Sequence, residues 1–279
     1  MMTNDHPKRP VRTSRPKLWR ALVMAGLTSG IATGLADAQS AGTEPAEGLW
    51  LAQSAVGEGG EGGEAGAGQS GDAVVDLLVG LGQAEGHLRS GMQIYAGGGM
   101  EMAATHMGHP KAELYAAIGA ALDAAGVAGF GTELDAVTAA LAAGKPVAEI
   151  EAAYTAALER IDAARSALGA SPKTRLMAMA LMLRAAGGEY DVGVKDGAIV
   201  KLAEYQDAWG FVETAKAEAG RLAEDRDPAV AGAATTVRAT LDGLAPAFPA
   251  LMPTGPISGD AQMVMAAAAT TELAAYALK

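Results

Sequence analysis

The sequence predicts an all-α fold, a multi-helix bundle of about seven or eight helices that follows a signal peptide and a Gly/Glu-rich linker. Apolar residues recur with the helical period through most of residues 73–279. No stretch alternates convincingly with the period of two that a half-buried strand requires. Proline, glycine and aspartate interrupt the apolar stripes at places that suit helix ends. Together these observations disfavour a fold built on a sheet.

The first interruptions of the helical pattern lie around a short segment that contains His106 and His109. A stripe over 74–95 predicts the first helix, and a short helical segment over 99–107 follows it. We expect Gly108 to stop this segment in a left-handed conformation, which puts His109 at the cap and Pro110 in the first turn of the next helix. The chain would then turn a tight corner between two helices.

Later breaks delimit the remaining helices. The stretch 174–186 is apolar nearly all round, which is typical of a central buried helix, and Gly187-Gly188 is expected to end it. Asp227-Pro228 is a clear helix start, and Ser258 or Asp260 can cap the last helix. The expected helices cover roughly 114–122, 134–142, 147–168, 174–186, 199–222, 228–245 and 261–278.

Residues 1–38 have the layout of a secretory signal peptide. Six Lys and Arg residues precede the apolar run 21–36, which leads into the cleavage signature Ala36-Asp37-Ala38. The run is too short and too rich in Gly and Thr for a stable membrane span, so an uncleaved anchor is the second interpretation. We therefore expect a periplasmic protein without a stable membrane span after cleavage.

The composition of the chain after residue 38 defines two further regions and excludes several kinds of partner and site. Residues 39–72 are predicted to form a disordered Gly/Glu-rich linker, and residues 73–279 a single helical domain. The chain has 21 Lys and Arg and 32 Asp and Glu; removing residues 1–38 takes away six and two of them and leaves a net charge of −15. Such a surface repels nucleic acid, and the absence of cysteine excludes disulfides and thiolate metal sites.

Glu85 stands at a core position of the first predicted helix. Its neighbours in the stripe, such as Leu78 and Met92, are apolar. A carboxylate there must be paired, protonated or bound to metal, because its desolvation alone costs too much. Arg89, four residues on, can pair with it; without such a partner, burial would raise the pKa of Glu85.

Three of the four histidines lie close together in the sequence. His87, His106 and His109, with Glu85 and Glu113, are the candidate metal ligands, because imidazole and carboxylate at a helix corner can converge on one ion. This donor set suits iron, zinc or copper. The alternative is structural: His106 interacts with a helix C-terminus and His109 caps the next helix.

A second acidic region follows the central helix. Glu189 precedes the Asp196-Gly197 turn, and Glu204 and Asp207 follow it, three residues apart on one helix face. An antiparallel arrangement of the two flanking helices would bring these three carboxylates together, a setting that hard cations prefer. The alternative is a solvated face balanced by Arg184 or Lys201.

The run "GEYDVGVKDGAIVKLAEYQDAWGFV" within residues 184–212 resembles the extracytoplasmic helical segment of bacterial high-affinity iron permeases. Upstream, "GHLRSG" and "HMGHPKAELY" resemble exported helical proteins of proteobacteria that combine both segments. The resemblance implies metal handling in the cell envelope, with iron favoured. The chain lacks the Arg-Glu-x-x-Glu signature of the permease itself, so a membrane metal transporter is expected as a separate partner.

The sequence leaves three functions open. The leading interpretation is a periplasmic, non-enzymatic protein that binds a metal ion, with iron favoured over copper or zinc, for an inner-membrane metal transporter or another envelope protein. The second is a metal-free helical interaction module of the envelope. A hydrolase comes third, because the chain has no Gly-x-Ser-x-Gly motif, no cysteine and no prominent His/Asp/Ser set.

Overall fold

The computed structural model describes residues 70–279, so the predicted signal peptide and nearly all of the predicted linker lie outside the described residues. The elements are α1 (Ala73–Ala96), α2 (Met100–His109), the π-helix η1 (Pro110–Leu114), α3 (Tyr115–Ala124), α4 (Gly131–Ala142), α5 (Val147–Ala167), α6 (Pro172–Gly193), β1 (Val194–Lys195), β2 (Ala198–Ile199), α7 (Leu202–Ala223), α8 (Pro228–Asp242) and α9 (Ala261–Ala277). The predicted all-α class is confirmed. With α2, η1 and α3 taken as one interrupted helix, the described residues contain eight helices.

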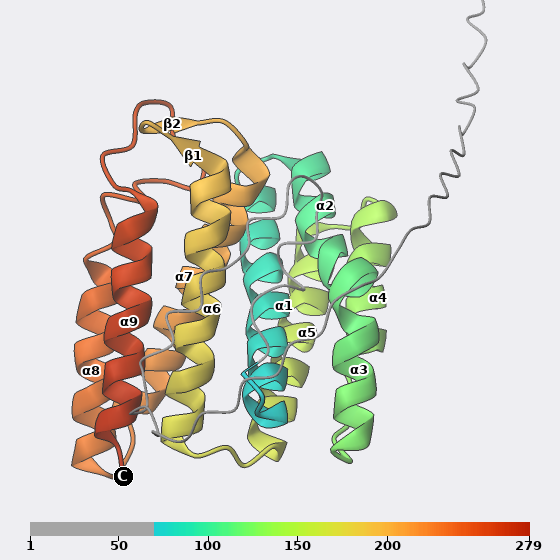
Figure 1. Cartoon of the computed structure of the whole chain (residues 1–279). Helices are drawn as coiled ribbons and strands as arrows, with labels where there is room; N and C mark the ends of the chain where they lie inside the picture. Colours follow the sequence, from blue (N-terminus) through green and yellow to red (C-terminus); the bar gives the residue numbers. More distant parts are fainter. Residues whose placement is uncertain (1–69) are drawn as a thin grey trace, which may run out of the picture. The chain divides into compact units, whose positions relative to one another are not determined.

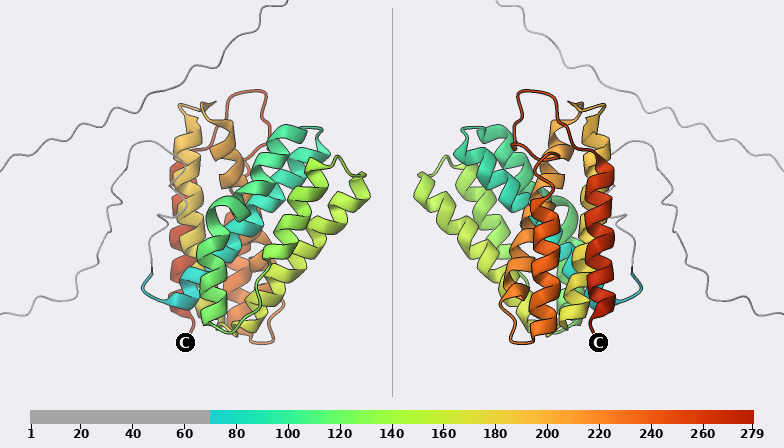
Figure 2. Two further views of the ribbon diagram at one scale, coloured as in Figure 1. Left: turned by 90° about the vertical axis from the view of Figure 1, so that its right-hand side faces the viewer. Right: turned by 90° about the vertical axis from the view of Figure 1, so that its left-hand side faces the viewer.

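The helices pack around two apolar cores. One core joins α6, α7, α8 and α9, and the other joins α1 to α5. Figure 1 shows α6 to α9 on one side and α1 to α5 on the other, and the two views of Figure 2 bring each group to the front in turn. Helix α1 contacts α7 and α6, so it connects the two cores.

Capping residues fix several of the helix starts. The carboxylate of Asp72 accepts hydrogen bonds from the backbone N–H groups of Val74 and Val75 at the start of α1. Asp227 and Asp260 accept in the same way at the starts of α8 and α9. These caps satisfy N–H groups that the helix itself cannot pair.

Two predicted helix ends are wrong. Gly108 has no positive φ, and α2 runs through it into η1 and α3, so the expected corner is a continuous helical path. A π turn over Pro110–Leu114 takes up the proline, which lacks a backbone N–H. Gly187 and Gly188 do not end α6, which continues to Gly193; at Gly187 the side chain of Met265 from α9 fills the space that a Cβ would occupy.

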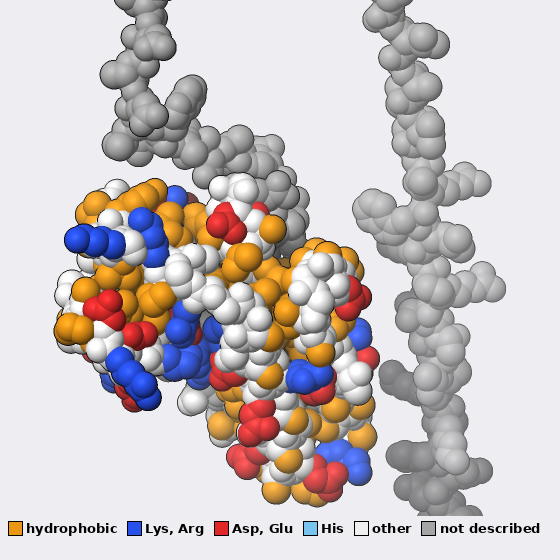
Figure 3. All heavy atoms as spheres, turned by 90° about the horizontal axis from the view of Figure 1, so that it is seen from below, with side chains coloured by type: hydrophobic (Ala, Val, Ile, Leu, Met, Phe, Trp, Pro, Cys, Tyr) orange, Lys and Arg blue, Asp and Glu red, His pale blue; other side chains and the backbone are white. Residues whose placement is uncertain are grey.

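The surface seen in Figure 3 mixes acidic and basic side chains with apolar ones, without a large area of one sign. Within residues 70–279, no helix has the length and hydropathy that a membrane span requires.

Helices α1 and α7 approach each other closely at a pair of glycines. A Cβ on Gly210 would collide with the carbonyl oxygen of Gly86 and with Oγ of Ser90. Ser90 Oγ also donates to the carbonyl oxygen of Gln206 at 2.6 Å. This contact fixes the register of α1 against α7 and determines which side chains of the two helices meet.

The substitution Gly210→Ala is expected to lower the free energy of unfolding by about 1–3 kcal/mol, because the two helix backbones must move apart. Gly232→Ala on α8 is the control, since a Cβ there meets nothing within 4 Å. It should raise stability by about 0.5–1 kcal/mol through helix propensity alone. Urea unfolding of both variants measures the difference, and equal stabilities would contradict the close packing of α1 on α7.

Candidate metal centre

Three buried side chains from three helices converge between α1, α2 and α7. His87 comes from α1, His106 from α2 and Asp207 from α7, and they are 0%, 1% and 2% exposed. One ligand atom from each lies within 4.8 Å of the other two. We call these three residues the His–Asp cluster.

Asp207 is the centre of the His–Asp cluster. Its Oδ1 lies 2.8 Å from Nδ1 of His87 and 2.8 Å from Nδ1 of His106. Burial would raise the pKa of Asp207, but the charge and hydrogen bonds of His87 and His106 hold it well below its usual range. The carboxylate is therefore ionised and available either to the imidazoles or to a cation.

The second ring nitrogen of His106 is oriented by Gln206. Nε2 of His106 lies 2.9 Å from Oε1 of Gln206, whose own amide nitrogen donates to the carbonyl oxygen of Leu251. Both nitrogens of His106 thus lie within hydrogen-bond distance of a side-chain oxygen. If a metal ion replaces the proton on Nδ1, a hydrogen bond from Nε2–H to Oε1 of Gln206 would hold the ring in place, as is common for metal-bound histidine.

His109 borders the His–Asp cluster without belonging to it. Its ring centroid lies 5.4 Å from that of His87 and 6.2 Å from that of His106. Its buried Nδ1 has no hydrogen-bond partner among residues 70–279. On the other side, the ring of Phe211 meets that of His87 edge-on at 5.3 Å and supplies an apolar wall. A third imidazole thus lies directly beside the His–Asp cluster.

The chemistry of the His–Asp cluster fits a transition-metal ion. Two imidazoles and one carboxylate are the donors that non-haem iron(II) and zinc prefer, and the buried setting keeps water from competing. Donor atoms around one such ion stand about 3–4 Å apart. The two 2.8 Å contacts are hydrogen-bond distances, so the imidazole nitrogens must release their protons and separate slightly from Oδ1 for an ion to enter.

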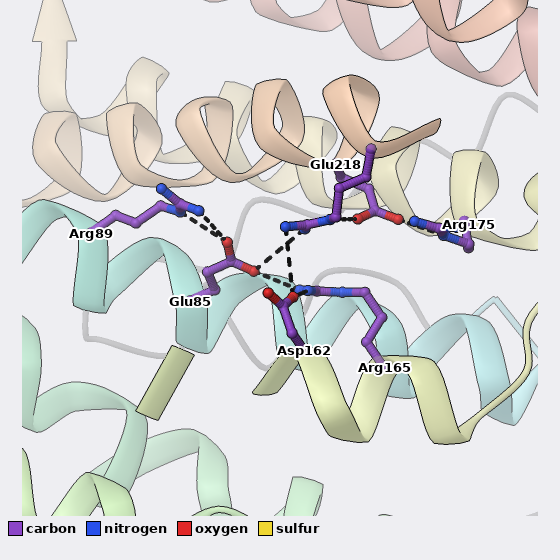
Figure 4. A network of polar contacts seen from close by, with 7 residues as sticks. Glu85, Arg89, Asp162, Arg165, Arg175 and Glu218 are labelled. Atoms are coloured by element: carbon purple, nitrogen blue, oxygen red, sulfur yellow. Dashed lines mark hydrogen bonds and ion pairs between the residues drawn. The ribbon is translucent and has the colours of Figure 1, made fainter. Parts of the chain in front are cut away.

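Glu85 lies apart from the His–Asp cluster, in a network of arginines (Figure 4). Its Oε1 accepts from Nε and Nη2 of Arg89, at 2.9 and 2.7 Å, and its Oε2 from Nη2 of Arg165 at 2.6 Å. Burial would raise the pKa of Glu85, but Arg165, Arg89 and Arg221 together lower it. The predicted pairing with Arg89 is thus present, and the pKa of Glu85 is lowered rather than raised.

The other predicted ligands also lie elsewhere. Glu113 is exposed on η1. Glu189 is half-buried on α6, and Glu204 lies at the start of α7, where its carboxylate is 3.8 Å from Nζ of Lys201. Of the second acidic group, Asp207 alone joins the histidines. No signal in the sequence set Asp207 apart, because its spacing placed it on the same helix face as Glu204.

The comparison with protein families finds one match. Residues 165–277 match the iron permease-associated 4-helix bundle domain, a range that covers α6, α7, α8 and α9. No curated protein and no solved structure matches the chain. Asp207 lies inside the matched range, whereas His87 and His106 come from helices before it. The resemblance predicted from residues 184–212 is thus confirmed, and residues 165–277 are similar to the iron permease-associated 4-helix bundle domain.

Proposed function

We propose that this is a periplasmic, non-enzymatic protein that binds one transition-metal ion, with iron(II) favoured, for a metal transporter of the membrane. The observation that carries the proposal is the buried convergence of His87, His106 and Asp207. The match of residues 165–277 to a domain associated with iron permeases supports iron over zinc or copper as the ion. Export follows from the signal peptide that the sequence predicts.

Burial favours holding an ion over turning over a substrate. A catalytic metal site keeps a coordination position open to substrate, whereas all three residues of the His–Asp cluster are almost without exposed surface. Glu85, the candidate acid–base group, is ionised and bound by arginines. A role in storing or passing on an ion fits these properties better than hydrolysis does.

One observation favours a metal-free structural module as the second candidate. Asp207 hydrogen-bonds Nδ1 of His106 and lies 2.8 Å from Nδ1 of His87, and Gln206 bonds the remaining nitrogen of His106. Such a buried polar network could serve only to fix α1, α2 and α7 in one arrangement.

Calorimetric titration of the metal-stripped full chain separates the two candidates. Anaerobic Fe(II), Fe(III), Zn(II) and Cu(I) are added in turn, and we expect one ion per chain with release of protons. His106→Ala should weaken binding ~100-fold or more, because it removes a ligand. Glu113→Gln is the control: it alters an exposed candidate ligand outside the cluster and should leave the affinity unchanged. Absence of binding, or equal affinity in His106→Ala, would favour the metal-free module.

A further inference from the structure

A second polar group lies between α1, α5, α6 and α7, with Glu85, Arg165 and Glu218 buried and its other members partly exposed. It consists of four arginines and three carboxylates: Glu85, Arg89, Asp162, Arg165, Arg175, Glu218 and Arg221. We call it the arginine network; Figure 4 shows Arg89 and Arg165 approaching Glu85 from two sides and Arg175 approaching Glu218. The network is separate from the His–Asp cluster, although Glu85 and His87 belong to the same helix.

The carboxylates of the arginine network are already engaged. Oε1 of Glu218 accepts from Nε of Arg175 at 2.6 Å, and its Oε2 accepts from Nε of Arg221 at 2.8 Å. Both oxygens of Glu85 are also occupied, and Asp162 pairs with Nη1 of Arg165. Four guanidinium groups face three carboxylates, so the arginine network carries a formal net charge of +1.

A cavity opens beside the arginine network. Its volume is about 20 Å³, and its walls include the side chains of Arg165, Arg175, Glu218 and Thr214. That volume is enough for about one species of the size of water. Apolar side chains complete the wall: Leu78, Ala178, Met179 and Met182, next to Gly82. Because Arg165 is only 9% exposed, water screens its charge little.

Thr214 gives an independent indication of a ligand. Its side chain on α7 is 1% exposed and lines the cavity, yet its Oγ1 has no hydrogen-bond partner in the described part of the chain. A buried hydroxyl without a partner is costly, and natural proteins rarely leave one. By contrast, the equally buried Thr271 donates to the carbonyl oxygen of Ala267 at 2.8 Å.

We infer that the cavity binds a small monovalent anion of the size of chloride, held by the guanidinium groups of Arg165 and Arg175 and by the hydroxyl of Thr214. A water molecule would satisfy the hydroxyl alone, whereas an anion would also balance the formal charge of +1 of the arginine network. A metal cation is disfavoured because two guanidinium groups in the wall are positively charged and the carboxylate of Glu218 is already shared by two arginines.

Thermal unfolding of the full chain tests this site. Sodium chloride and sodium bromide are compared with sodium gluconate at one ionic strength, so that general screening is constant and only the anion changes. We expect a higher melting temperature in chloride and bromide, rising with concentration. Thr214→Val should weaken the halide response about 10-fold or more, because it removes one hydrogen bond to a charged species. Thr214→Ser should retain the response.

Thr271→Val is the matched control, a buried threonine on α9 whose hydroxyl is bonded within its own helix. It should keep the full halide response, and Thr214→Val should keep full affinity at the His–Asp cluster. Crystals in bromide should show an anomalous peak within the cavity. An equal response to the three salts, an unchanged response in Thr214→Val or a cavity without bromide would overturn the inference.

Discussion

Replacing Glu85 by glutamine is expected to lower the free energy of unfolding by about 3–5 kcal/mol, the range for breaking a buried ion pair from one side. The carboxylate binds Arg89 through Oε1 and Arg165 through Oε2. Glutamine removes the charge and places an amide N–H₂ against one of the two guanidinium groups. Arg165, which is buried, would then lose the partner that holds its charge in the core.

Glu149→Gln is the control for the loss of one carboxylate. Glu149 is an exposed residue whose carboxylate lies 3.2 Å from Nζ of Lys145, and its removal should change stability by less than about 0.5 kcal/mol. Guanidinium chloride unfolding of both variants gives the comparison. A loss below 1 kcal/mol in Glu85→Gln would mean that the arginine network contributes little to stability.

The stability difference between wild type and Glu85→Gln should also depend on pH. The arginines lower the pKa of Glu85 in the folded protein below its ordinary value of 4.5. A carboxyl group whose pKa is lowered by folding stabilises the protein above the unfolded value, and this contribution is lost as the pH falls through the folded value. The difference should therefore be full at pH 7 and shrink progressively below about pH 4.5.

Replacing Asp207 by asparagine is expected to have two large effects. Metal affinity should fall ~100-fold or more, because the charged ligand of the His–Asp cluster is lost. The metal-free protein should lose about 3 kcal/mol of stability, since the carboxylate that pairs both His87 and His106 disappears from the interior. Titration calorimetry and chemical unfolding of the same preparation measure the two effects.

Glu204→Gln on the same helix is the matched control. Glu204 is one turn before Asp207, carries the same charge and lies by Lys201 rather than by the histidines. It should bind metal like the wild type and unfold within about 0.5 kcal/mol of it. If Asp207→Asn is destabilised but wild type binds no metal, the cluster is a structural network. If both variants bind metal equally, the ion lies elsewhere.

Local sequence signals predicted the helices well, because those signals act through the neighbouring backbone. The carboxylates of Asp227 and Asp260 cap the starts of α8 and α9, as their positions before apolar stripes indicated. The same reasoning failed at Gly108 and Gly187. There the helices continue because a π turn absorbs Pro110 and because Met265 packs over Gly187. A glycine permits a helix end but does not require one.

For the candidate ligands too, the sequence predicted the residue types but not which of them meet. The sequence identified His87, His106 and Asp207 as donors but placed Asp207 in a different group. It also grouped Glu85 with His87, although residues two positions apart on a helix are rotated by about 200° and so face opposite sides. Accordingly, Glu85 meets Arg165 of α5, while His87 meets Asp207 of α7.

The sequence by itself determined the helical class, most helix starts, the donor types and the resemblance to an iron permease-associated domain. Only the tertiary structure decided which donors meet. His106 and Asp207 are 101 residues apart, and they meet because α7 packs on α1 at Gly86 and Gly210 while α2 packs on α1 at Gly91. Periodicity shows which face of a helix is buried, whereas the partner of that face depends on how the helices pack.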